Sequence, residues 1–230
     1  MSKPFEKWKT QEVENTFGIQ VIYDSPTLTK WLEVHREPSE IETTLLLEWR
    51  NKLVKYINYF NESDISMFFI SNVLTLVDFI QEGYRAYTQL GMKTVLRDVT
   101  GKDVEIGGKV EMAVARGKQI PDTPFFFLNE YKPEKRTGSE SDPKGQLLIA
   151  MLVAQAKNST ENQGEYPIYG CYVNGRNWHF VVLENKTYCV SNAFNATDND
   201  IFSIFSILWE VKRYIHQRLN LPFEEAKRKP

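Results

Sequence analysis

The sequence predicts one α/β or α+β domain in which a central mixed sheet lies between helices. Strand-like runs gather in the middle of the chain, over residues 84–132 and 167–191. Runs with apolar residues at helical spacing flank them, over 39–80, 143–155 and 197–219. The resulting order of helix, three strands, helix, strands and helix is typical of a sheet covered by helices.

Composition favours an ordinary globular protein. The chain has 230 residues, of which 42% are hydrophobic and 25% charged, so one domain with an added helical region is expected. The net charge of −2 excludes a generic nucleic-acid binder and requires any phosphate contact to be a local basic patch. No apolar run is long enough to span a bilayer, and the first residues lack an apolar signal core, so we expect a cytoplasmic protein.

The first third of the chain predicts mainly helices. A short strand is expected within Glu14–Tyr23 and a short helix over Thr27–His35. Ser39 and Glu42 form a capping box that opens a longer helix. Its apolar stripe predicts a core or packing face, with a base-stacking platform as the alternative for Trp49 and Tyr56; the stripe is Ile41, Leu45, Trp49, Leu53, Tyr56, Ile57 and Phe60.

Turn and capping signals set the remaining boundaries. Residues 61–64 break and restart the helix, and Tyr84–Leu96 is a first core strand or a helix end leading into one. Asp142-Pro143 has the N-cap and first-turn residues of a helix. Asn174-Gly175 marks a hairpin turn in the last group of strands, and residues 197–200 cap the final helix.

Two acidic strands stand out at the centre of the chain. In the strand Pro124–Lys132, alternation places Phe126, Leu128, Glu130 and Lys132 on one face, and Phe125, Phe127, Asn129 and Tyr131 on the other. A carboxylate and an ammonium at the end of an apolar strand are costly unless they are paired or bind an ion. In the strand Lys109–Arg116, Glu111 shares a face with Ala113 and Ala115.

If these strands form a hairpin, Glu111 lies beside Glu130. Two carboxylates at the end of a sheet suit Mg²⁺, which is held by one or two carboxylates together with water and substrate phosphate. Lys132 would then position or deprotonate a water, or stabilise charge on the phosphate.

This arrangement resembles the PD-(D/E)XK nuclease superfamily. Glu130-Tyr131-Lys132 matches the second half of the motif, and Glu111 matches the first half in position, with a longer arm than the usual Asp. Asp122 of Pro121-Asp122 is an alternative first acid, although its surroundings are typical of a turn. The resemblance covers residues 61–192 and is strongest over 106–155. By order of elements it extends to the N-terminal nuclease domain of type I restriction subunits and to uncharacterised bacterial relatives.

The resemblance implies a restriction-endonuclease-like fold over residues 61–230, with residues 1–60 as an N-terminal helical extension. It implies Mg²⁺ or Mn²⁺ bound by Glu111 and Glu130, with Glu62 as a third acid whose alternative role is to satisfy a helix dipole. It also implies that Gln146, early in the following helix, supports the site; a plain exposed glutamine is the alternative.

The expected activity is metal-dependent phosphodiester hydrolysis of nucleic acid, with DNA as the first choice of partner. The alternative is an inactive module of the same fold that binds nucleic acid or a protein. A homodimer is a further expectation, and no membrane partner is expected. The backbone-binding cations would be Arg116, Lys118, Lys135, Arg136 and Lys144.

Overall fold

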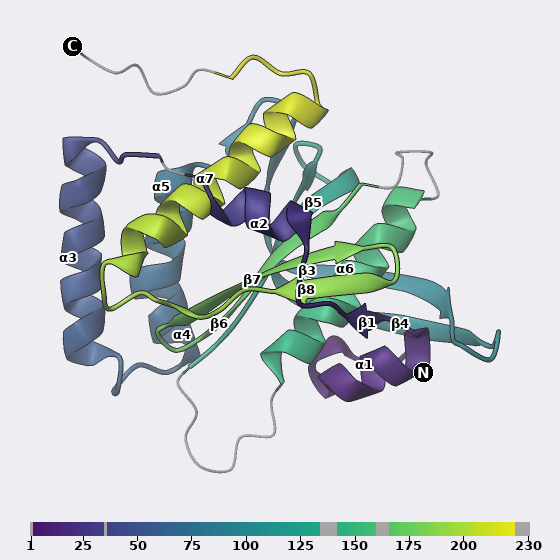
Figure 1. Cartoon of the computed structure of the whole chain (residues 1–230). Helices are drawn as coiled ribbons and strands as arrows, with labels where there is room; N and C mark the ends of the chain where they lie inside the picture. Colours follow the sequence, from purple (N-terminus) through teal and green to yellow (C-terminus); the bar gives the residue numbers. More distant parts are fainter. Residues whose placement is uncertain (1, 35, 134–141, 160–165, 224–230) are drawn as a thin grey trace.

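The computed structural model describes residues 2–34, 36–133, 142–159 and 166–223. Over these residues the chain forms a nine-stranded mixed sheet with helices on both faces (Figure 1). The strand order is β1-β8-β7-β6-β5-β4-β3-β2, and β9 pairs with β7. The predicted central mixed sheet between helices is therefore confirmed.

Most neighbouring strands are antiparallel, but β5 pairs with β6, and β1 with β8, in parallel. The predicted strand over Tyr84–Leu96 is β3, so the alternative of a helix end is excluded. The strands are β1 (Gln20–Val21), β2 (Ile80–Gln81), β3 (Tyr84–Arg97), β4 (Asp103–Arg116), β5 (Asp122–Lys132), β6 (Ile168–Asn174), β7 (Asn177–Glu184), β8 (Thr187–Val190) and β9 (Phe194–Asn195).

The helices form two layers. One face of the sheet is covered by η1 (Phe5–Lys7), α1 (Thr10–Phe17) and α6 (Pro143–Ser159). The other face carries α2 (Pro26–Leu32), α3 (Glu40–Tyr56), α4 (Glu62–Ile65), the π-helical segment η2 (Ser66–Ile70), α5 (Ser71–Val77) and α7 (Asp200–Arg218) (Figure 1). None of the described helices combines the length and apolar character needed to cross a membrane.

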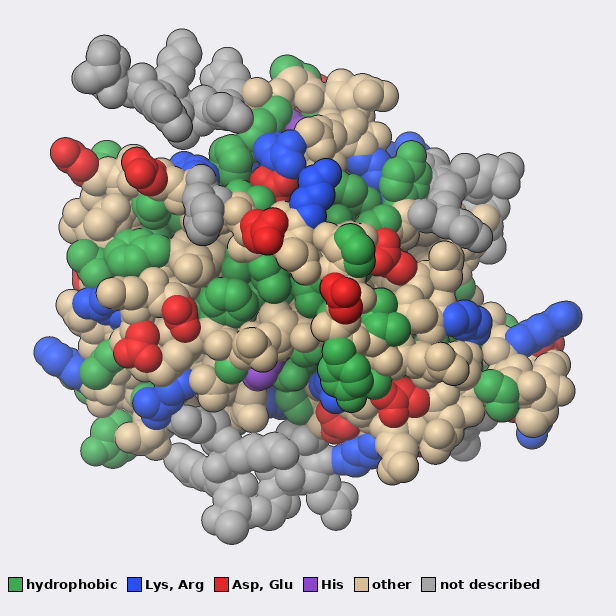
Figure 2. Space-filling model, in the orientation of Figure 1, with side chains coloured by type: hydrophobic (Ala, Val, Ile, Leu, Met, Phe, Trp, Pro, Cys, Tyr) green, Lys and Arg blue, Asp and Glu red, His purple; other side chains and the backbone are tan. Residues whose placement is uncertain are grey.

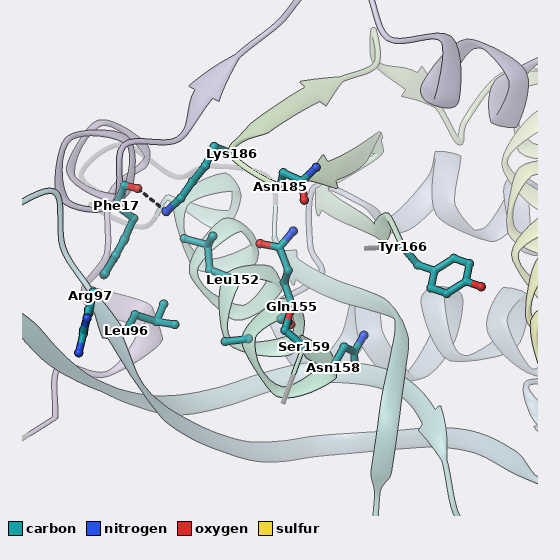
Figure 3. A pocket seen from close by; sticks show the side chains of 11 residues that line it. Phe17, Leu96, Arg97, Leu152, Gln155, Asn158, Ser159, Tyr166, Asn185 and Lys186 are labelled. Carbon is teal, nitrogen blue, oxygen red and sulfur yellow. Dashed lines mark hydrogen bonds between the residues drawn. The ribbon is translucent and has the colours of Figure 1, made fainter. Parts of the chain in front are cut away.

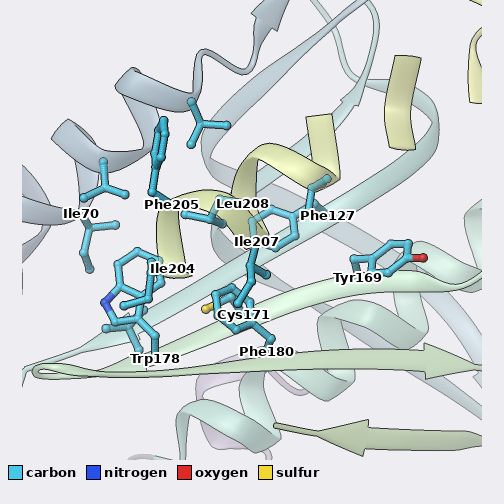
Figure 4. Packing of buried hydrophobic residues seen from close by; sticks show 14 of the residues in the cluster. Ile70, Phe127, Tyr169, Cys171, Trp178, Phe180, Ile204, Phe205, Ile207 and Leu208 are labelled. Carbon is cyan, nitrogen blue, oxygen red and sulfur yellow. The ribbon is translucent and has the colours of Figure 1, made fainter. Parts of the chain in front are cut away.

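The larger core lies between the sheet and α7. Phe127 and Phe180 on the strands belong to one buried cluster with Ile204 and Phe205 of α7, and the ring of Trp178 is also part of it (Figure 4). Burial of large apolar side chains of this kind is the main favourable term in folding. This core fixes β5, the strand that carries Glu130.

A β-bulge changes the faces predicted for the start of β5. Val114 pairs with Phe127 but Ala115 with Phe125, so Phe126 is the extra residue. Phe126 therefore joins the core on the face of Phe127, while Phe125 joins that of Leu128. The predicted alternation was wrong for Phe125 and Phe126, because simple period-two alternation cannot reveal an inserted residue.

The predicted stripe of α3 is also partly wrong. Leu46 and Leu53, seven residues apart, are the fully buried side chains of this helix. Ile41 and Tyr56, which the stripe placed in the core, are exposed. The helix presents a narrower apolar face to the core than its sequence suggests, and apolar side chains remain on the surface.

The N-terminal segment contacts both strand β8 and helix α6. β1 pairs with β8, and the start of α1 meets the start of α6, where a Cβ on Gly145 would lie 2.6 Å from the Thr10 backbone nitrogen. Asp142 links the two helices, because it accepts from the backbone N–H of Gly145 at 2.9 Å and of Thr10 at 2.8 Å. Asp142 is thus the helix cap that the sequence predicted.

Candidate active site

Glu130 is the centre of the candidate site. It lies near the end of β5 with only 3% of its surface exposed. The Lys132 ammonium lies 3.1 Å from Glu130 Oε1 and donates to Glu62 Oε1 at 2.8 Å. Glu62 is the first residue of α4, directly after the Asn61 cap. The structure thus brings together Glu62, Glu130 and Lys132, all of which were predicted site residues.

Glu111 lies on β4, the antiparallel neighbour of β5. Met112 pairs with Asn129, so Glu111 and Glu130 occupy the next facing positions of the two strands. The Glu111 carboxylate accepts from the side-chain amide of Gln89 on β3. Gln89 has a φ of 50°, a left-handed conformation that is uncommon for residues other than glycine. Gln89 was not among the predicted site residues, because no local sequence pattern indicates a left-handed residue within a strand.

The charges of the site are unevenly compensated. Burial raises the pKa of Glu130 to about 7, against the opposing effect of Lys132, and the Glu111 and Glu62 carboxylates add to the rise. Burial disfavours the Lys132 ammonium, but Glu130 and Glu62 raise its pKa above the ordinary value overall. Glu130 and Glu62 therefore share one ammonium, with the Glu111 carboxylate as a further negative charge nearby, and Lys132 is protonated at neutral pH.

Asn129 and Tyr131 were predicted on the other face of β5 but were not among the predicted site residues. The Tyr131 hydroxyl is 2.7 Å from the Ser66 hydroxyl in η2. Burial, the largest cause, raises the pKa of Tyr131 to about 12, with Glu111 and Glu62 contributing. Asn129 is fully buried, and neither of its amide atoms has a partner among the described residues. Short π-helical segments such as η2 are frequent at functional sites.

Gln146 lies early in α6, as predicted, but it points to another partner. It is buried, and its amide donates to the Glu6 carbonyl of η1 at 3.4 Å. Among the described contacts it has none with Glu111, Glu130 or Lys132. The observed role of Gln146 is to join α6 to η1.

The predicted cations do not form one patch in the described residues. Arg116 binds Asp122 at 2.7 Å. Asp122 begins β5 and Arg116, its partner, ends β4, so both lie about 30 Å from Lys132 at about 3.3 Å per strand residue. Asp122 is therefore far from the site, which removes it as the alternative first acid.

The other cations are dispersed. The Lys118 carbonyl accepts from Arg85, near the same remote end of β5. Lys144 lies in the first turn of α6, half-buried and without an ion pair in the described part of the chain. Lys135 and Arg136 lie outside the described residues.

Whether this site could hold a divalent cation depends on the carboxylates of Glu111 and Glu130. No group of three or more His, Cys, Asp or Glu side chains in the described residues is arranged to hold a metal ion. Glu130 Oε1 is buried and, apart from the Lys132 ion pair, has no hydrogen bond in these residues. Mg²⁺ requires only one or two carboxylates, with water and phosphate completing its shell. Glu111 and Glu130 supply suitable hard oxygen donors.

A separate hollow of about 470 Å³ lies at the other end of α6 (Figure 3). Its lining includes Gln155 and Asn158 of α6, and Lys186, which donates to the Phe17 carbonyl at 2.9 Å. Asn158 is already used there, because its amide bonds both backbone groups of Phe125. This hollow has no side chain in common with the site around Glu130.

Compared with known protein families and with curated proteins, the chain matches none. The function of the site is therefore inferred from its own chemistry.

Proposed function

We propose that this protein is a Mg²⁺- or Mn²⁺-dependent phosphodiesterase that hydrolyses nucleic acid. The observation that carries the proposal is the buried Glu130 carboxylate. Glu130 lies opposite Glu111 on the adjacent strand, and the Lys132 ammonium is 3.1 Å from its Oε1 atom. A cluster with more carboxylates than cations favours binding of a further cation. Perturbed carboxyl groups of this kind are concentrated at functional sites.

The residues of the cluster have distinct roles in this proposal. Glu111 and Glu130 would hold the ion, and Gln89 orients the Glu111 carboxylate. A bound divalent cation neutralises phosphate charge and lowers the pKa of a coordinated water. Lys132 is protonated, so it stabilises negative charge on the phosphate and orients the water; its raised pKa disfavours a role as a base.

A second function is favoured by one specific observation. Lys132 is already paired with both Glu62 and Glu130. Because the lysine is occupied by these two carboxylates, the arrangement also suits an inactive module of the same architecture that binds nucleic acid or a protein partner. Fold alone does not distinguish an enzyme from such a module.

Digestion assays separate the two functions. Plasmid, linear duplex, single-stranded DNA and RNA would be incubated with Mg²⁺, Mn²⁺ or EDTA. We expect metal-dependent cleavage by the wild type and its loss in Glu130→Gln, while Glu105→Gln, an exposed glutamate on the same hairpin, keeps the activity. A wild type that cuts none of these substrates while binding them supports the inactive module.

A further inference from the structure

Four exposed apolar side chains and the partly buried Phe60 lie close to Glu62 in the chain. This aromatic surface consists of Tyr56, Tyr59, Phe60, Met67 and Phe68, from the end of α3, the following loop and η2. Tyr56 is 51% exposed, Tyr59 76% and Phe68 50%. The sequence pattern had placed Tyr56 on a core or packing face, with base stacking as the alternative. Exposed aromatic side chains in a contiguous group commonly mark a binding site.

The rings of this surface are arranged in a series. Tyr56 and Phe60 are stacked, with centroids 6.2 Å apart and planes 16° apart. Phe60 and Phe68 follow at 6.0 Å with an angle of 38°. Flat ring faces that remain partly open suit other flat rings, and every nucleobase presents such a face.

Residues that lie between members of the aromatic surface in the chain contact β5 at the candidate active site. Phe60 precedes the Asn61 cap, and the next residue, Glu62, holds Lys132 at 2.8 Å. On the other side of Glu62, Ser66 contacts Tyr131 of β5, two positions before Phe68. A strand of nucleic acid stacked on these rings would therefore have its backbone next to Glu62 and Lys132.

Charge next to the rings agrees with a nucleic-acid ligand. Lys55, in the last turn of α3, is exposed and has no ion pair among the described residues. Figure 2 shows apolar side chains at the lower end of α3 with both basic and acidic side chains beside them. Stacking rings with a neighbouring lysine are the combination that sequence-tolerant single-strand binders use.

We propose that the aromatic surface stacks the unpaired bases of a single-stranded nucleic acid and leads its backbone into the site around Glu130. This inference rests on the proposed function and assigns its substrate class. A base paired within a duplex does not offer its face to a side chain, so the surface selects single strands over duplexes.

Binding and cleavage would be measured separately. Fluorescence anisotropy with a labelled single strand and the matching duplex, each in EDTA and in Ca²⁺, reports binding without Mg²⁺-dependent hydrolysis. We expect Tyr59→Ala and Phe68→Ala to weaken single-strand binding about five-fold or more, the range of one lost stacking contact. Tyr59→Phe should bind as the wild type does, because the ring is kept. Tyr23→Ala, which removes a 92% exposed tyrosine outside the surface, is the matched control.

Three outcomes would overturn the inference. These are no single-strand binding by the wild type under either condition, equal binding by Tyr59→Ala and the wild type, and an equal loss in Tyr23→Ala. A dimer in sedimentation velocity that dissociates in Tyr59→Ala without a change in binding would assign the surface to a second copy instead. If the protein shows no Mg²⁺-dependent cleavage but its single-strand binding still depends on the rings, the nuclease function is refuted and the stacking surface is retained.

Discussion

Lys132 and Glu62 are 70 positions apart in the chain, and their Nζ and Oε1 atoms lie 2.8 Å apart. This pair joins the end of a core strand to the start of α4 on one face of the sheet. The lysine is mostly buried, whereas the glutamate is partly exposed. Glu62 therefore shares with Glu130 the only ammonium that the described ion pairs place in this cluster.

Metal binding should stabilise the fold. At about ten times its dissociation constant, Mg²⁺ should add about 1.4 kcal/mol and raise the melting temperature by about 3–6 °C. Glu130→Gln should melt no lower than the wild type in EDTA at pH 8 and should lose the response to Mg²⁺. Differential scanning fluorimetry with EDTA and with Mg²⁺ measures both effects. A lower melting temperature for the variant in EDTA would indicate a purely structural ion pair.

Glu130 should make stability depend on pH in a known direction. Its pKa is raised to about 7, against 4.5 for an unperturbed glutamate. Between these values the folded state holds a proton that the unfolded state has lost, so stability falls as pH rises from about 4.5 to about 7. The difference in unfolding free energy between the wild type and Glu130→Gln should change within this window by about 1.4 kcal/mol for each pH unit. Urea titrations at pH 5, 6, 7 and 8 test it; a constant difference contradicts the buried carboxyl.

Removing the ammonium should affect both activity and stability. Lys132→Met should lower the cleavage rate by about 10²-fold or more, as expected when a charge-stabilising group is lost. It should also destabilise the fold more at pH 8 than at pH 5, because Glu130 is ionised only at the higher pH. Lys102→Ala, in an exposed turn, is the control. An equal stability loss at both pH values would show that Lys132 acts mainly through its aliphatic stem.

Nucleic-acid binding should depend on salt through selected lysines. Lys144→Ala should reduce the slope of log affinity against log salt by about 0.7 on a single strand. Arg116→Ala should leave the slope unchanged, because Arg116 is paired with Asp122 at the remote end of β5. Anisotropy titrations at several salt concentrations compare the two variants. A larger effect of Arg116→Ala would place the backbone path over the opposite end of the sheet.

Much of the architecture was predictable because its signals are local. The Asp142 cap and the Ser39–Glu42 capping box were predicted from neighbouring residues, and both are present. The facing of Glu111 and Glu130 followed from strand alternation and a short connection.

The rest depends on interactions that no local pattern encodes. Phe126 is an inserted residue in β5, and Gln89 adopts a left-handed conformation opposite Glu111. Tyr56 has the spacing of a core residue, yet about half of its surface is exposed. Arg116 and Lys132 are close in the sequence, but the length of β5 separates them in the structure.

The pairing of β1 with β8 has a consequence for synthesis of the chain. Gln20 pairs with Thr187, and the apolar side chains of Phe5, Trp8 and Phe17 are covered by elements that include α6. A growing chain emerges from the ribosome N-terminus first, so these residues are made long before their partners. β1 therefore lacks its partner strand until translation has passed Thr187, and the rings lack α6 until translation has passed Pro143. During that interval these exposed rings are a natural binding target for chaperones.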